Sequence, residues 1–501
     1  MNSFQKKALA AAVFAGLGSG AAMAAHVNPA GLGQYLIFPY YTVQQSGGNA
    51  YNTIVTVVNT TTLGKVVKVR FREGKNSREV LDFNLYLSPN DVWVGVLSSA
   101  DATTSSPARL TTPDTSCTNP RIPATGVDFR NFLLGEASDF VTDKSMARTR
   151  EGYLEMIESA TVYGDTLLAI THDATGVPAD CDAVNPVPAA NLLTDFDVPT
   201  GGLSGTGNLI NVNNGTDMAY KPVAISNAFF LPIAPTLGSE SVRATDLDPW
   251  SVRLVGTSDN PTGQEGDQVY MDDWFLTTPF PGVNAMSALM MSTQVMNEFV
   301  IETGTKSATD WVLTFPTKRF YYASASPFTA STPFTAAGTT AGACETISFE
   351  YVNREERGAA AGGEDFSPPP PAGPASTLCW EANVVSLRGD SSSGASLVLG
   401  SQNVRDIAIT TGAQNGWGKL TFTGANATGV GLTSNATSDA YNWSTLGTQI
   451  NVPKRFLGLP VTGFMLRTFN NGTLSCGTGT CISNFGSALD HSYRVSISPS
   501  P

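Results

Sequence analysis

The chain is long and acidic. It has 501 residues, and 42 acidic side chains against 29 basic ones give it a formal net charge of −13. This charge argues against nucleic acid and anionic membrane surfaces as partners, because both would repel the protein. A chain of this length can bury a sizeable core without help from disulfide or metal cross-links. It fits about two to four domains or one large β architecture.

Residues 1–24 predict a cleavable export signal. Lys6 and Lys7 form a basic start, residues 8–18 are apolar, and Ala22-Met23-Ala24 has the small-x-small pattern of a signal peptidase site. The apolar stretch is too short to span a bilayer as a helix, which needs about 20 residues. We therefore expect an exported protein at the cell surface or outside the cell, with the periplasm as the alternative and no transmembrane helix in the mature chain.

Residues 25–115 predict an antiparallel β-sandwich of immunoglobulin-like type. Apolar and polar side chains alternate over 67–72 and again over 81–87, which is the period of a strand with one wet face. The polar, glycine-containing residues 73–77 between them have the chemistry of a hairpin connection. Short strands separated by regular turns are typical of such a sandwich.

The rest of the chain is also expected to be mainly β, with few short helices. We divide it into a β-rich middle domain over 116–330, with short helices over 128–150, and a β-rich C-terminal domain over 331–501. The methionine-rich residues 286–296 fit a helix or a buried strand. Residues 357–376 hold alanine–glycine runs and consecutive prolines, and we interpret them as a mobile or polyproline loop.

The cysteines predict structural disulfides. An even number in an exported chain favours disulfide bonds, and neither a Cys-x-x-Cys spacing nor a neighbouring histidine points to zinc. Proximity along the chain favours the pairs Cys117–Cys181, Cys344–Cys379 and Cys476–Cys481.

The second of these pairs raises a conflict. If residues 347–352 and 380–387 formed a simple hairpin, Cys344 and Cys379 would lie at opposite ends, about 25–30 Å apart, which is too far for a disulfide. Either these strands are not hairpin partners or the cysteine pairing differs. With the disulfide in place, residues 357–376 would be a tethered loop rather than a linker between domains.

Histidine is scarce, which limits catalysis. Only His26, His172 and His491 occur, and although Asp173 and Asp490 adjoin two of them, adjacency in sequence is not the geometry of a hydrolytic triad. No Gly-x-Ser-x-Gly elbow accompanies them, so we expect structural or loop histidines. A signal cut one residue later would instead make His26 the N-terminal residue, and with a second histidine it would resemble the copper clamp of lytic polysaccharide monooxygenases.

Acidic loops raise the alternative of a calcium site. Asp259, Glu265 and Asp267 lie close in sequence, and calcium prefers such hard oxygen ligands, but their spacing does not fit the twelve-residue loop with its closing glutamate. We expect solvated carboxylates there and no cofactor, with calcium as the alternative. Nothing in the sequence selects a carboxylate pair for glycoside hydrolysis.

Several aromatic side chains suit stacking on sugar rings, although on the strands of a sandwich such residues more often pack in the core. They are Tyr35, Tyr40, Tyr41, Trp311, Phe320, Tyr321, Tyr322, Trp417 and Trp443.

Several stretches together carry a resemblance. They are residues 31–41 (GLGQYLIFPYY), 59–61 (NTT), 150–155 (REGYLE), 309–319 (TDWVLTFPTKR) and 458–464 (GLPVTGF). In these stretches the chain resembles exported proteobacterial cell-surface proteins, a family without an assigned activity. The resemblance spans most of the mature chain. It implies a surface or secreted role and supplies no catalytic residues.

The sequence leaves rival functions open. The first hypothesis is a non-catalytic surface or extracellular protein, structural or adhesive, whose partners are further copies of itself or components of the cell envelope. The second is a secreted carbohydrate-active enzyme or glycan-binding protein that uses the aromatics and acidic loops. An outer-membrane β-barrel ranks third, because its strands would not carry mixed charged faces.

Overall fold

The structure is a computed structural model, and it describes part of the chain. The described residues are 24–45, 50–136, 139, 141–188, 190–228, 251–258, 267–273, 281–321, 333–335, 344–356, 376–389, 392–409, 414–424, 431–433 and 454–499. Nearly all of the predicted signal and of the proline-rich loop lies outside them. Over these ranges no helix combines the length and the apolar character that crossing a membrane requires.

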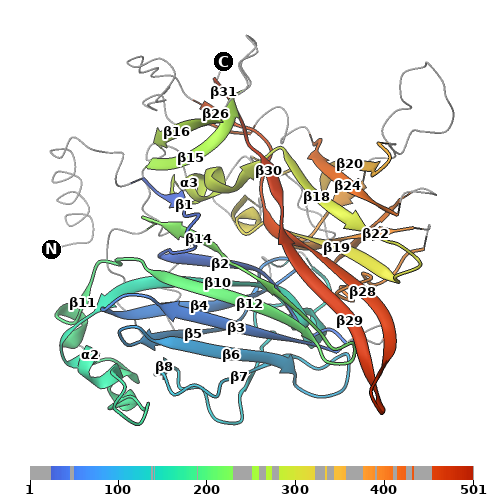
Figure 1. The fold of residues 1–501 in the computed structure, drawn as a ribbon. Helices are drawn as coiled ribbons and strands as arrows, with labels where there is room; N and C mark the ends of the chain where they lie inside the picture. Colours follow the sequence, from blue (N-terminus) through green and yellow to red (C-terminus); the bar gives the residue numbers. More distant parts are fainter. Residues whose placement is uncertain are drawn as a thin grey trace.

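Two antiparallel sheets face each other and form a first β-sandwich (Figure 1). One sheet has the order β1 (His26–Val27), β14 (Val223–Ser226), β2 (Tyr35–Thr42), β10 (Glu151–Val162), β4 (Gly64–Glu73), β5 (Glu79–Leu87) and β8 (Thr118–Asn119), with β11 (Phe196–Asp197) beside β10. The facing sheet has the order β13 (Thr216–Tyr220), β12 (Leu203–Asn211), β3 (Tyr51–Asn59), β6 (Val92–Ser99), β7 (Ala108–Thr111) and β9 (Val127–Asp128).

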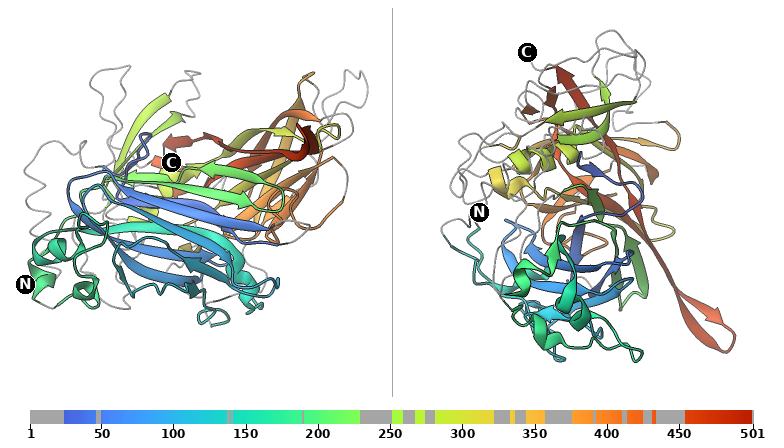
Figure 2. Two further views of the ribbon diagram at one scale, coloured as in Figure 1. Left: turned by 60° about the horizontal axis from the view of Figure 1, so that its bottom comes forward. Right: turned by 90° about the vertical axis from the view of Figure 1, so that its left-hand side faces the viewer.

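A second sandwich lies against the first (Figure 2). Its outer sheet has the order β21 (Ser376–Leu378), β20 (Glu345–Asn353), β24 (Asn415–Phe422), β18 (Gln294–Val300) and β30 (Ser492–Arg494). Its inner sheet has the order β23 (Val404–Ala408), β22 (Ala382–Arg388), β19 (Ser307–Thr314), β28 (Thr462–Cys476) and β29 (Gly479–Asp490). The predicted fold class, mainly β with an antiparallel sandwich at the start, is confirmed.

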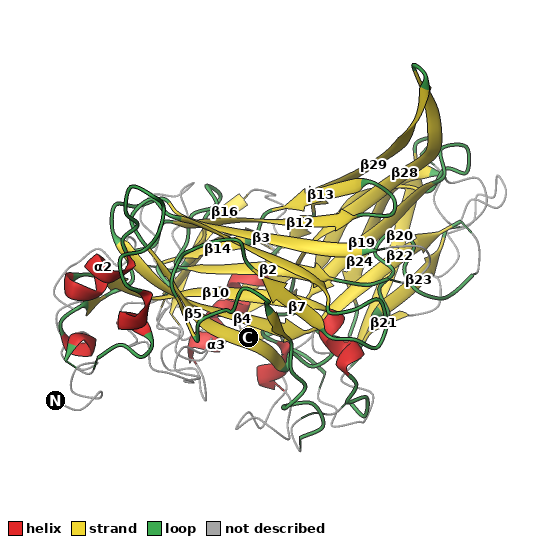
Figure 3. Ribbon diagram, turned by 90° about the horizontal axis from the view of Figure 1, so that it is seen from below, coloured by secondary structure: helices red, strands yellow, loops and turns green. Residues whose placement is uncertain are grey.

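Smaller elements complete the fold. A further sheet has the order β16 (Asp267–Asp273), β15 (Ser251–Ser258), β31 (Ser496–Pro499), β26 (Lys454–Phe456) and β25 (Leu432–Thr433), and β17 (Met291–Ser292) pairs with β27 (Leu459–Pro460). The helices are α2 (Gly164–Ile170), α3 (Pro281–Met290) and the 3-10 turns Met146–Arg150, Cys181–Val184, Asn191–Leu193 and Lys318–Tyr321. Figure 3 shows how little of the molecule is helical.

The methionine-rich stretch contains both structures that the sequence allowed. It is helical to Met290 in α3, which is buried over the residues whose side chains are described, and it continues as the strands β17 and β18. A helix that is apolar on all sides is stable only when it is covered on all sides. In this fold α3 contacts both β15 and β27.

The central strand of the inner sheet, β19, is buried on both faces over residues 309–314. Along β19, Val312 belongs to the core of the first sandwich, whereas its neighbours Trp311 and Leu313 belong to the core of the second. Successive side chains of a strand point to opposite faces, so one strand serves two cores. This arrangement explains why β19 contains three consecutive apolar residues, 311–313.

Sheet membership crosses the boundaries predicted at 115/116 and 330/331. Among the strands that follow residue 115, β10, β12, β13 and β14 complete the first sandwich, while β18 and β19 belong to the second.

The face of β4 that the alternating sequence predicts to be wet is buried. Lys68, Arg70 and Arg72 are each less than a tenth exposed. Burial of a charge is tolerated when it is paired, and each of the three meets a carboxylate. The pairs are Lys68–Asp82, Arg70–Glu79 and Arg72–Glu155.

All three predicted disulfides are confirmed. They are Cys117–Cys181, Cys344–Cys379 and Cys476–Cys481. The conflict over the second pair is resolved because the two strands in question are not hairpin partners. The strand β20 pairs with the short strand β21 and not with β22. The register sets Glu345 beside Leu378, and this places the two cysteines next to each other.

Candidate functional site

In the described part of the chain, the outer face of the second sandwich presents one tryptophan to solvent. Trp417 lies on β24, the strand between β20 and β18, and its side chain is 46 % exposed. Leu420 and Phe422 on the same strand are buried in the core. Alternation along the strand therefore turns Trp417 outward.

Glycines on both sides of Trp417 set its position. A side chain at Gly416 would collide with the backbone of β20 at Val352, and one at Gly418 would collide with the ring of Phe349. Glycine in a strand marks such a close approach of backbone or neighbouring side chain. The two glycines thus let β24 lie tightly against β20, on the face of the strand opposite to the indole.

Charged side chains frame the indole. Glu298 of β18 is its cross-strand neighbour and pairs with Arg467 of β28 at 2.9 Å, while Lys419 of β24 pairs with Glu350 of β20 at 2.9 Å. Exposed ion pairs contribute little to stability, so these groups remain able to bond other polar molecules. We call the following residues the Trp417 face: Glu298, Glu350, Val352, Trp417, Lys419 and Arg467.

The other aromatic candidates have structural positions. Tyr35, Tyr40, Tyr41, Trp311 and Tyr321 are buried. Tyr35 donates a hydrogen bond to Glu155 at 2.5 Å, and Tyr40 donates one to Glu151 at 2.6 Å.

The remaining candidates add no exposed ring to this set. Phe320 is half-buried, and Tyr322 and Trp443 lie outside the described residues. Of the nine candidates, Trp417 is the one whose ring is exposed within the described part of the chain.

His491 is a structural residue. Its Nε2 donates to the Val312 carbonyl at 3.1 Å, because a carbonyl oxygen can only accept, and its Nδ1 accepts from the Asn297 amide at 3.0 Å. Burial lowers the pKa of His491 to about 3. The ring is neutral at physiological pH, and both of its nitrogens are occupied.

His172 meets residues that sequence adjacency did not suggest. Its Nδ1 lies 2.9 Å from the Ser88 hydroxyl and 3.6 Å from the Asp91 carboxylate, while Asp173 accepts bonds from its own turn at Thr175. In a hydrolytic triad the serine and the carboxylate bind opposite nitrogens of the histidine. Here both approach the same nitrogen, so the residues of a triad are present without its geometry.

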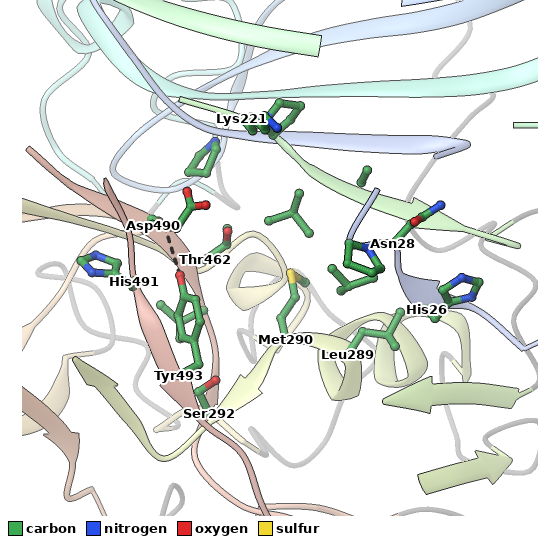
Figure 4. Close-up of a pocket in the computed structure, with 18 of the residues that line it drawn as sticks. His26, Asn28, Lys221, Leu289, Met290, Ser292, Thr462, Asp490, His491 and Tyr493 are labelled. Atoms are coloured by element: carbon green, nitrogen blue, oxygen red, sulfur yellow. Dashed lines mark hydrogen bonds between the residues drawn. The ribbon is translucent and has the colours of Figure 1, made fainter. Parts of the chain in front are cut away.

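A cleft of about 750 Å³ separates the edge of the first sandwich from α3, β17, the start of β28 and β30 (Figure 4). Its walls are largely apolar, with Leu289 and Met290 of α3 on one side, and Lys221 and Asp490 contribute charges to its lining. An apolar cleft with a few polar groups is a common form of small-molecule site.

The two cleft histidines do not form a metal pair. Figure 4 places His26 and His491 at opposite ends of the cleft. His26 Nδ1 lies 3.1 Å from the carbonyl oxygen of Ala24, and His491 has no free nitrogen. In the described ranges no three His, Cys, Asp or Glu side chains gather to hold a metal ion.

The calcium hypothesis is left as a prediction. Asp259 and Glu265 lie outside the described residues, and Asp267 is the first residue of β16, with no described side chain.

A buried charge cluster joins the two sandwiches, and sequence reasoning missed it. Glu155 of β10 accepts from Arg72 Nε at 2.6 Å and lies 3.7 Å from Arg319 of the second sandwich. Burial acts to raise the pKa of Glu155, but Arg72 and Arg319 outweigh it and lower that pKa to about 2. Nearby, burial raises the pKa of Glu381 to about 8 and lowers the pKa of Lys318 to about 8.

Comparison of the chain with family models, with curated proteins and with solved structures found no match. The class of protein is therefore inferred from the fold and its disulfide bonds alone. The chain is a mainly β protein whose three disulfides indicate an oxidising, extracytoplasmic environment.

Proposed function

We propose that this chain is an exported, non-catalytic adhesive protein of the cell surface or extracellular space, and that it binds carbohydrate through the Trp417 face. The observation that supports this proposal is the indole of Trp417, 46 % exposed on the outer side of a sheet and framed by two ion pairs. An indole gives a rigid apolar platform for the less polar face of a sugar ring. The carboxylates accept bonds from sugar hydroxyls, and the cations of Lys419 and Arg467 donate to them.

Binding suits this face better than hydrolysis. A glycosidase needs a carboxylic acid with a raised pKa and a second carboxylate across the scissile bond, in a site that closes around the sugar. Glu298 and Glu350 are each paired with a cation and are about half exposed on an open sheet. Such carboxylates are open to solvent and do not enclose a scissile bond, which favours recognition over hydrolysis.

Glycan binding is tested with a single substitution and a matched control. The mature protein, Trp417→Ala and Phe132→Ala are applied to a glycan array, and the best glycan is then titrated calorimetrically. Phe132 is an aromatic residue outside the Trp417 face and is 78 % exposed, so its replacement controls for nonspecific binding by exposed aromatic side chains. We expect Phe132→Ala to bind as the native protein does and Trp417→Ala to lose at least tenfold in affinity, or about 1.4 kcal/mol.

Two results would overturn the proposal. The first is a native protein that binds no glycan on the array, and the second is equal affinity of Trp417→Ala and native protein. Release of reducing sugar from a bound glycan would replace adhesion with hydrolysis. Cell fractionation tests the location, since a wholly soluble periplasmic monomer would contradict a surface or extracellular role.

A further inference from the structure

The hairpin of β28 and β29 extends beyond the body of the protein. The right-hand view of Figure 2 and the view from below in Figure 3 show it projecting from the second sandwich. Its strands are 15 and 12 residues long, and β29 is the edge strand of the inner sheet. Midway along β29, β13 packs against one face of the strand, where Met218 lies above Gly486 and the Asn484 amide donates to the Asn214 carbonyl at 2.9 Å.

A disulfide holds the tip of this hairpin. Residues 475–481 are exposed, and Cys476–Cys481 links the two strands there. A two-stranded hairpin without a core beneath it is marginally stable in water. The cross-link therefore maintains the extended shape in a part of the chain where packing does not.

The free edge of β29 lacks the charged and proline residues that usually protect such an edge, and β13 covers one face of the strand without pairing with it. Residues 479–489 contain no charged side chain and no proline, and Asp490 is the one charge, at the end of the strand. Soluble proteins normally guard long edge strands with lysine, proline or a covering element, because unpaired backbone groups are a template for another strand. Phe485, in the middle of this edge strand, is 62 % exposed.

The backbone of this edge is available for pairing. In the described chain, β29 pairs with β28 alone, and no other backbone bond from its residues is formed. The amide of Asn297 bonds to the carbonyl oxygens of Leu489 and Asp490, at the base end of the strand. The distal stretch keeps its outward N–H and C=O groups for another strand.

We infer that β29 pairs with β29 of a second copy of this chain, antiparallel and about a two-fold axis, so that the two inner sheets join into one. Charge favours this partner, because a chain of net charge −13 repels its own copies over most of its surface, whereas residues 479–489 meet themselves without like charges. A two-fold interface must be self-complementary. An axis at Phe485 sets Asp490 opposite Thr480 of the second copy, so the acidic residues do not face each other.

Dimerisation through β29 does not depend on glycan binding, and it is tested by measuring the oligomeric state of the protein. Native mass spectrometry and light scattering at micromolar concentration compare the mature protein with Phe485→Lys and Phe132→Lys. Both positions are exposed, so both variants should fold, which circular dichroism verifies. We expect a dimer for the native protein and for Phe132→Lys, and loss of the dimer for Phe485→Lys, since lysine on an edge strand opposes pairing.

A second measurement needs no substitution. In hydrogen exchange, those amides of residues 480–488 that do not bond to β28 should become protected as protein concentration rises, while the amides of β24 should not change. A native protein that stays monomeric, a dimer that survives Phe485→Lys, or protection of β29 that is independent of concentration would each overturn the inference.

Discussion

Replacing Glu155 with glutamine tests the charge cluster between the sandwiches. Glutamine keeps the shape but removes the charge that Arg72 and Arg319 share. The ordinary pKa of 4.5 and the folded value of about 2 differ by an amount that corresponds to about 3 kcal/mol of stability at pH 7. Because the folded pKa is depressed, this contribution is complete above pH 4.5 and is lost as the pH falls towards 2, so about 1 kcal/mol should remain at pH 3.

Urea unfolding of native protein and Glu155→Gln at pH 7 and pH 3 measures both quantities. Glu350→Gln is the control, because the Glu350 side chain is 57 % exposed and its pairing should contribute little. Equal losses for Glu155→Gln at the two pH values, or a loss below about 1 kcal/mol at pH 7, would refute the electrostatic reasoning.

Further outcomes follow from the buried groups and the cross-links. The raised pKa of Glu381 means that native stability falls as the pH rises from 4.5 towards 8. Glu381→Gln should therefore be the more stable protein at pH 7, by about 3 kcal/mol in urea unfolding, and an equally or less stable variant would contradict this. The lowered pKa of His491 predicts ring NMR signals that do not titrate between about pH 5 and 8, and a midpoint near 6.5 would be incompatible with it. Replacing Cys117 and Cys181 by alanine opens a cross-link spanning 64 residues and should cost about 4 kcal/mol in the same assay, whereas a loss under about 1 kcal/mol would mean that the bond constrains little.

Local features were the predictable part of the fold. Strand periodicity gave the β class, and cysteine proximity gave the disulfides, because both depend on neighbouring residues. The assignment of strands to sheets was not accessible in this way. Glu155 of β10 and its partner Arg72 lie 83 positions apart in the chain, and no local sequence pattern around either residue predicts that they form an ion pair.

The sequence predicted Trp417 only as one of nine candidate aromatic residues and could not single it out. Trp417 stood among nine aromatic residues of similar sequence context, and exposure, which separates it from Trp311 or Tyr35, depends on which faces the sheets cover. One local signal was available. Glycines on both sides of a tryptophan suggest a strand that lies close to its neighbours on the face opposite to the tryptophan.

The shared inner sheet makes the two halves of the protein mutually dependent. Removal of either sandwich would expose one apolar face of β19, with Val312 on one side or Trp311 on the other. Neither half is therefore a self-sufficient fragment, and a proteolytic cut between them should release no stable piece. A binding surface built on such a scaffold is held by the whole chain.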